Sequence, residues 1–205
     1  MNYINKLLLS GLVLILSSFI FSSCATTPRV TRPPSDEQVD LSGNWNDTDS
    51  QLVSKEMVPD SLTRPWVEEF SSKNNAKPRV IVGTVLNKSH EHINTETFVK
   101  DLERELTNSG RVRFVASKSQ RNEIREERVE QAKNASTKTA KSSGQEYGAD
   151  FMLKGQINTI MDEAGKMQLK YYQIELEMID MTTNEKVWIG QKKIKKIVER
   201  SRMKL

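Results

Sequence analysis

The sequence predicts an α/β protein with a single mixed sheet in β-α-β-α-α-β-β-β order and with helices packed mainly on one face. Three observations support this prediction. Residues 79–85, RVIVGTV, are β-branched and apolar on both faces, as in a central strand. Residues 95–110 place apolar side chains at helical spacing. Residues 166–181 alternate apolar and polar side chains, as in a strand with one face in water.

Two helices are expected ahead of the first strand. Spaced apolar residues follow the run NDTDS, where Asp47 or Asp49 would cap a helix because the helix dipole favours acids at that end. We expect Pro59 to interrupt this helix and a second, short helix to begin near Pro65.

The remaining elements follow in order along the chain. Asn94 or Thr95 would cap the helix of residues 95–110, and Gly110 would close it in the left-handed conformation. A turn at residues 182–185 is expected to use Asn184 in that same conformation. The other predicted elements are a short strand (111–115), a polar helix (117–134), a smaller helix that ends at Gly148 (136–148) and three strands (150–160, 166–181 and 185–198).

The N-terminus has the features of a lipoprotein signal. A mostly apolar run from Leu7 to Phe21 is shorter than the roughly 20 residues of a membrane-spanning helix. Small residues follow, and then Cys24, which is the one cysteine of the chain. FSSC at 21–24 resembles a bacterial lipobox, in which the cysteine is acylated and becomes the mature N-terminus, with Phe21 where leucine is usual. We expect Cys24 to be the lipidation site.

These features divide the chain into three predicted parts. Residues 1–23 form a lipoprotein signal peptide, and residues 24–38 form a lipidated, proline-containing, disordered tether. Residues 39–205 form a globular domain with a basic C-terminal tail from about residue 192 to residue 205. By resemblance to proteobacterial sorting, Ala25 in place of aspartate favours the outer membrane, with the domain facing the periplasm.

Charge and composition argue against several functional classes. The formal net charge is +4, with charges mixed along most of the chain, so no nucleic-acid partner is expected. No glycine-rich phosphate loop occurs, and no nucleophile has a recognisable base beside it. We therefore expect no enzyme activity, no catalytic residues and no cofactor.

The histidines allow one metal-binding alternative. His90 and His92 lie in the segment SHEH, and zinc would need a third ligand such as Glu91 or a distant carboxylate. Two exposed loop histidines are the more economical interpretation, so we expect no metal site.

The order of several segments resembles the LpoB family of outer-membrane lipoproteins, which activate a bifunctional penicillin-binding protein. The matching segments are Cys24, VSK at 53–55, RVIVGTVLN at 79–87, LERELTNSGRVRFV at 102–115, YGADFML at 147–153 and NEKVWIGQ at 184–191. The resemblance implies a fold similar to the N-terminal domain of TolB. The chain departs from the enterobacterial pattern in its short tether and its longer basic tail.

The resemblance implies an activator that binds a class A penicillin-binding protein and supports peptidoglycan synthesis, with the membrane bound through lipid on Cys24. The predicted contact surface comprises Asn87, Lys88, Lys154 and Gln156. The alternative is a structural lipoprotein that binds the cell wall or anionic envelope components through its basic C-terminus. An edge strand protected by lysines would explain the same basic residues without such a site.

Overall fold

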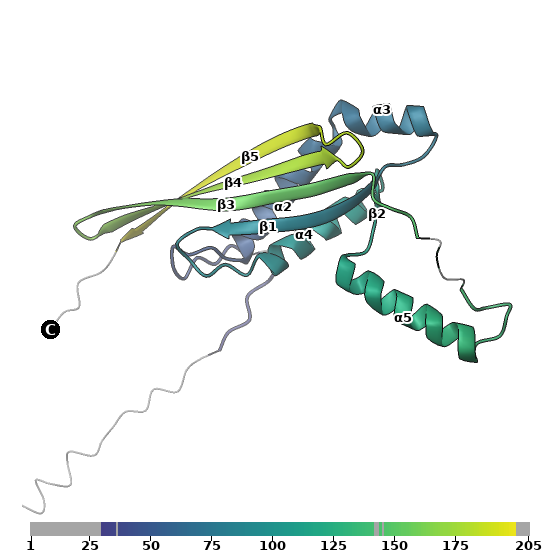
Figure 1. Cartoon of the computed structure of the whole chain (residues 1–205). Coiled ribbons are helices and arrows are strands. Elements are labelled where there is room, and N and C mark those ends of the chain that lie inside the picture. Colours follow the sequence, from purple (N-terminus) through teal and green to yellow (C-terminus); the bar gives the residue numbers. More distant parts are fainter. Residues whose placement is uncertain (1–29, 36, 142–143, 145, 200–205) are drawn as a thin grey trace, which may run out of the picture. The chain divides into compact units, whose positions relative to one another are not determined.

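The computed structural model describes residues 30–35, 37–141, 144 and 146–199 (Figure 1). Contacts divide the chain into two units after Glu37, and every helix and strand described lies in the second unit. The elements are α2 (Asp47–Leu62), α3 (Pro65–Asn74), β1 (Arg79–Lys88), α4 (Thr95–Asn108), β2 (Arg113–Phe114), α5 (Lys118–Asn134), β3 (Phe151–Ala164), β4 (Met167–Asp180) and β5 (Lys186–Glu199).

The five strands form one mixed sheet in the order β2-β1-β3-β4-β5, which confirms the predicted fold class. β1 pairs in parallel with β2 and β3, whereas β3, β4 and β5 form an antiparallel meander. The turn between β4 and β5 uses Asn184 at φ 64°, and Gly110 lies past the end of α4 at φ 66°. Both left-handed positions agree with the sequence prediction.

One face of the sheet, called the covered face below, packs against α2 and α4. Alternate residues of β4 point to it, and Tyr172, Ile174, Leu176 and Met178 are all fully buried there. The helices contribute fully buried residues of their own, including Phe98 of α4. Each such side chain adds about 1.5–3 kcal/mol to stability, so this face holds the core. The other side of the sheet is called the open face.

α2 differs from its prediction at both ends. Its N-cap is Asn46, whose side chain accepts from the Asp49 amide at 3.1 Å while Asp49 accepts from the Asn46 amide at 2.9 Å. The predicted interruption at Pro59 is wrong, because the helix continues to Leu62. Pro59 removes a hydrogen bond to the carbonyl of Lys55, an exposed residue, and the buried side chains beyond Pro59 hold the helix together.

The second helix predicted between β2 and β3 is also wrong. The described residues from 136 to 150 contain turns and extended segments but no helix. This stretch has almost no apolar residues, so a helix there could bury nothing to offset its conformational entropy. α5 does form, but none of its side chains is buried, so α2 and α4 are the helices that cover the sheet.

Gly155 is required where β3 passes β4. A Cβ atom at this position would lie 2.5 Å from the carbonyl oxygen of Glu175, a backbone atom that no rotamer change can move. We expect Gly155→Ala to lower the free energy of unfolding by about 1–3 kcal/mol, measured by urea denaturation. Gly148→Ala is the matched control, because nothing lies within 4 Å of its Cβ position. Equal stability of the two variants would contradict the close approach.

Candidate functional site

The predicted lipidation residue, Cys24, lies outside the described residues, so its modification stays a prediction. Within the described part of the chain, no helix is both long enough and apolar enough to cross a membrane. The surfaces considered below all belong to the unit that begins at Gln38.

The segment Asp40–Asn46, called the N-terminal strap below, runs over the covered face of β4 and β5. The Tyr172 hydroxyl donates to the carbonyl of Gly43 at 2.9 Å, and Lys196 Nζ donates to the carbonyl of Asn44 at 3.1 Å. Gly43 lies so close to β5 that a Cβ atom there would overlap Val198. The strap is therefore bound to the sheet by both hydrogen bonding and close packing.

A partly buried carboxylate, Glu91, joins the strap to the sheet. Glu91 Oε1 accepts from Lys170 Nζ and from the Tyr172 hydroxyl, each at 2.8 Å. Its other oxygen accepts from the backbone amide of Trp45 at 3.0 Å. The Trp45 ring in turn packs edge-on against the rings of Tyr172 and Phe98, with centroids 5.7 and 5.8 Å apart. Three segments far apart in sequence therefore meet at one carboxylate.

The protonation states of this network follow from its contacts. Burial raises the pKa of Glu91, but the hydrogen bonds from Lys170 and the two other donors outweigh that effect and lower the pKa below its ordinary value of 4.5. Burial raises the pKa of Tyr172, and its hydrogen bond to Glu91 raises it further. Glu91 is therefore charged and Tyr172 neutral near pH 7.

A second, partly buried group of ion pairs lies beside the first. Lys196 Nζ donates to Asp49 Oδ2 at 2.7 Å and to Asp40 Oδ1 at 3.0 Å. Hydrogen bonds from Gln38, Lys196 and Asn46 lower the pKa of Asp40 to about 2. Burial dominates at Asp49 and raises its pKa despite the same lysine. β5 is thereby bound to both the strap and the start of α2.

The SHEH loop has a structural explanation that does not involve metal. Its Glu91, a candidate zinc ligand from sequence, faces Lys170 and Tyr172. His90 Nδ1 lies 2.9 Å from the hydroxyl of Thr159 on β3, and His92 is exposed. Among residues 30–35, 37–141, 144 and 146–199, no group of three or more His, Cys, Asp or Glu side chains is placed to hold a metal ion.

The lysines of the basic C-terminal segment divide between the two faces of β5. Residues up to Glu199 continue this strand, and residues 200–205 lie outside the described part. Lys192 and Lys196 point to the covered face and pair with acids, whereas Lys193 and Lys195 are exposed on the open face. β5 is an edge strand, as the lysine pattern indicated.

Three of the four predicted contact residues lie together on the open face. The strand register pairs Lys88 with Asn158, Lys154 with Glu177, and Gln156 with Glu175, so all of these side chains project on the same side. Gln156 Nε2 donates to Glu175 Oε2 at 2.7 Å, while Lys88 and Lys154 are exposed. We call Leu86, Lys88, Lys154, Gln156, Glu175, Glu177 and Ile189 the open-face patch.

Asn87 is separated from the other three. It pairs with the fully buried Ile157 and so projects toward the covered side of β1. Its amide nitrogen donates to the carbonyl of Glu91 at 2.8 Å, and its oxygen accepts from the Ser89 amide at 2.9 Å. Asn87 holds the loop that presents Glu91, which is a structural role.

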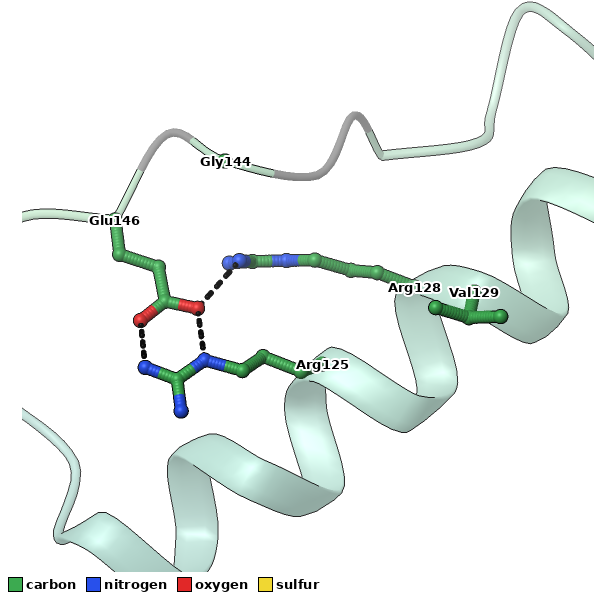
Figure 2. Close-up of a pocket in the computed structure, with 5 residues that line it drawn as sticks. All are labelled: Arg125, Arg128, Val129, Gly144 and Glu146. Atoms are coloured by element: carbon green, nitrogen blue, oxygen red, sulfur yellow. Dashed lines mark hydrogen bonds and ion pairs between the residues drawn. The ribbon is translucent and has the colours of Figure 1, made fainter.

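A pocket of about 470 Å³ lies between α5 and the chain that follows it. Figure 2 shows the residues that line this pocket. Arg125 binds Glu146 through two parallel hydrogen bonds of 2.9 and 2.8 Å, and Arg128 lies 3.3 Å from the same carboxylate. The hydrogen bonds from Arg125 lower the pKa of Glu146. A guanidinium pair of this kind recognises carboxylates, and here the carboxylate comes from the chain itself.

Comparison with known proteins identifies the family. The model of the family described as "Peptidoglycan-synthase activator LpoB" matches residues 49–194, most of the chain. The chain therefore belongs to the LpoB family of peptidoglycan-synthase activators. A comparison with curated protein sequences finds no match.

Solved structures of LpoB are among those that resemble the chain. The C-terminal domain from Salmonella enterica is 15% identical, with 63% of this chain and 93% of that chain covered and a TM-score of 0.36. The C-terminal domain from Escherichia coli is 14% identical, covering 66% and 98%, with a TM-score of 0.37. The NMR structure of E. coli LpoB is 13% identical, covering 88% and 87%, with a TM-score of 0.41. Family membership rests on the family model alone.

Sequence reasoning missed the network around Glu91, although one signal for it was available. In the alternating strand of residues 166–181, Lys170 lies an even number of residues from Tyr172 and Ile174. The pattern therefore placed this lysine on the same, core-facing side of the strand. A buried lysine needs an acidic partner. The arginine pair around Glu146 had no such signal, because Arg125 and Arg128 of α5 precede Glu146 by 21 and 18 residues, and the segment around Glu146 has no periodicity.

Glu91→Gln tests the buried network. We expect it to lower the free energy of unfolding by about 2 kcal/mol near neutral pH, because it removes the charge that neutralises Lys170. The folded-state pKa of Glu91 lies below 4.5, so this difference from wild type is full above pH 4.5 and shrinks as pH falls through that pKa. Urea unfolding across this range measures it. Glu126→Gln, at an exposed site on α5, is the control, and a pH-independent difference would contradict the assignment.

Glu146→Gln tests the arginine pair shown in Figure 2. Because the contact is exposed, we expect the global urea midpoint to remain unchanged. Trypsin should cleave after Lys138 several-fold faster, since the loop loses its attachment to α5. Glu123→Gln on the same helix is the control. Cleavage at the wild-type rate in Glu146→Gln would show that the ion pair does not restrain the loop.

Proposed function

We propose that this chain is a lipid-anchored outer-membrane protein that faces the periplasm and activates a peptidoglycan synthase of the class A penicillin-binding protein type. The observation that supports this most is the family match across residues 49–194. Cys24 in its lipobox-like setting supports the lipid anchor, and Ala25 supports outer-membrane sorting. The domain acts through binding rather than through chemistry of its own.

The open-face patch is the proposed synthase contact. It has a rigid polar centre, because Glu175 accepts from Gln156 at 2.7 Å and from Gln173 at 2.6 Å. Two exposed apolar side chains flank this centre, Leu86 at 49% exposure and Ile189 at 62%. Apolar groups beside fixed polar groups on a rigid sheet suit a protein partner, because little side-chain entropy is lost on binding.

Activation requires that the domain bind the competent synthase better than the idle one. A tenfold shift in the ratio of the two states needs a difference of about 1.4 kcal/mol in binding free energy. One or two well-packed contacts on the patch can supply that difference. An activator of this kind therefore needs only a small dedicated surface.

The tether limits where the contact occurs. About fifteen residues separate Cys24 from the domain, which reach at most about 50 Å when fully extended. The synthase must therefore present its activator-binding part close to the outer membrane. A synthase part that stays near the inner membrane would be out of reach.

Glycan-chain synthesis by the class A penicillin-binding proteins of the same organism tests the proposed function. The chain from residue 25 onward should raise the rate several-fold with one synthase and leave the others unchanged. No rate change and no binding with any of them would refute the activator function, and it would leave the family fold without the family activity.

Lys154→Ala combined with Gln156→Ala tests the contact surface. We expect its affinity for the responsive synthase to fall at least about tenfold, because the pair lies at the centre of the patch. Titration calorimetry or surface plasmon resonance measures this. Lys100→Ala, at an exposed position on α4, is the control and should bind as wild type does. Unchanged affinity of the double variant would remove the open-face patch as the contact.

A further inference from the structure

The strands β3, β4 and β5 extend past the end of β1. The β1–β3 pairing ends at Lys88 and Asn158, whereas β3 continues to Ala164 and its turn into β4. Figure 1 shows this extension as the far end of the β3–β4 hairpin beside the last part of β5. We call it the ribbon end; it comprises residues 159–171 and 195–199.

The ribbon end exposes apolar side chains on its open face. Two neighbouring rows of the register, Ile160–Tyr171–Lys195 and Asp162–Leu169–Ile197, contain them. Ile160 is 64% exposed and Ile197 is 75% exposed. Tyr171 and Leu169 lie between them, half-buried. Contiguous exposed apolar side chains of this kind mark an interaction surface.

Basic and aromatic groups accompany this apolar surface. Lys195 Nζ lies 5.9 Å from the centre of the Tyr171 ring, and Lys193 is exposed one row nearer the open-face patch. The exposed acids Asp162 and Glu199 share this face nearer the tip, so the lysines that can meet an anionic surface are those at 193 and 195. Apolar side chains, a tyrosine and lysines together are the composition of surfaces that lie in the interface of an anionic bilayer.

The tether enters the domain at this same end. Lys196, next to both Lys195 and Ile197, binds Asp40 at 3.0 Å, and the N-terminal strap follows from Asp40. The strap and the last residues of β5 together line a groove of about 500 Å³. Gln38, where this unit begins, therefore lies beside the ribbon end.

We infer that the ribbon end rests on the phospholipid surface to which the tether is anchored. This inference rests on the lipid anchor of the proposed function. A tether of about fifteen residues keeps the ribbon end at an effective concentration in the millimolar range near the bilayer, so a weak contact is sufficient. Ile160 and Ile197 enter the interface, and Lys193 and Lys195 contact anionic headgroups.

A second copy of this chain fits the ribbon end less well. Pairing two copies through this face would bring Lys193 and Lys195 of one copy near the same lysines of the other. Like charges that face each other across an interface destabilise it. An anionic lipid surface offers the opposite charge to these lysines and needs no shape complementarity.

Labelled single-cysteine variants test the inference on vesicles of phosphatidylethanolamine and phosphatidylglycerol. The chain from residue 25 onward lacks Cys24, so an introduced cysteine is unique. An N-terminal histidine tag and a nickel-chelating lipid replace the lipid anchor, which makes the test independent of acylation at Cys24. The label sites are Ile160→Cys and Ile197→Cys, with Leu86→Cys and Ile189→Cys as controls on the same face in the open-face patch.

We expect an environment-sensitive label to shift to the blue at positions 160 and 197 and to be quenched there by lipid-borne quenchers, but not at positions 86 and 189. Equal signals at all four sites, or stronger quenching at the controls, would overturn the inference. A blue shift at 197 that grows with protein concentration without vesicles would overturn it in favour of self-association. Failure of synthase activation leaves these signals unchanged, so the two proposals fail separately.

Charge reversal gives a second measurement. Without the histidine tag, Lys193→Glu and Lys195→Glu should each weaken vesicle binding about fivefold or more, and added salt should weaken wild-type binding steeply. Lys166→Glu is the control, because Lys166 lies in the turn between β3 and β4 rather than on the open face. It should weaken vesicle binding less than the other two substitutions do. Binding that is insensitive to both substitutions and to salt would refute the headgroup contact.

Discussion

The Glu91 carboxylate is the interaction on which the arrangement of this domain depends. It is partly buried and charged, and it satisfies a buried lysine, a buried tyrosine and a backbone amide at once. An uncompensated charge at this place would cost several kcal/mol, so the loop after β1, the strap and β4 have to assemble together. In the same way, the ion pairs of the adjacent Lys196 bind β5 to the strap and to α2. Charge pairing, and not apolar packing alone, therefore determines the place at which the chain enters the domain.

Strict alternation along β3, β4 and β5 gives the sheet two different faces. Every second residue points to the covered face and forms the core with α2 and α4. The residues between them point to the open face, which no described helix covers. That open face has a polar centre near Glu175 and an apolar far end near Ile197. A protein partner suits the first and a lipid surface suits the second, so a single sheet can serve both without competition.

Much of this fold was predictable because its signals are local. The period-2 pattern of β4 and the helical spacing around Phe98 are consequences of burying one face, and both predicted elements formed. The continuation of α2 through Pro59 was not predictable, because the tertiary packing of buried residues beyond it outweighs a local preference. The partners of Lys170 and Lys196 lie 79 to 156 residues away, and a single sequence contains no record of such pairings. The short helix predicted after α5 failed because propensity without burial does not stabilise a helix.

The attachment of the strap has a mechanical consequence. If, as proposed, lipid holds the domain at one end and a synthase binds it at the other, the domain is under tension whenever the envelope layers move apart. The pull enters at Asp40, and the strap passes it to β4 and β5 through the Tyr172–Gly43 and Lys196–Asn44 hydrogen bonds and the Trp45 contacts. The two long antiparallel strands would share this load with the start of α2, because the strap continues directly into that helix at Asp47. The Glu91 network, which joins the strap to β4, would add to the force that this link withstands.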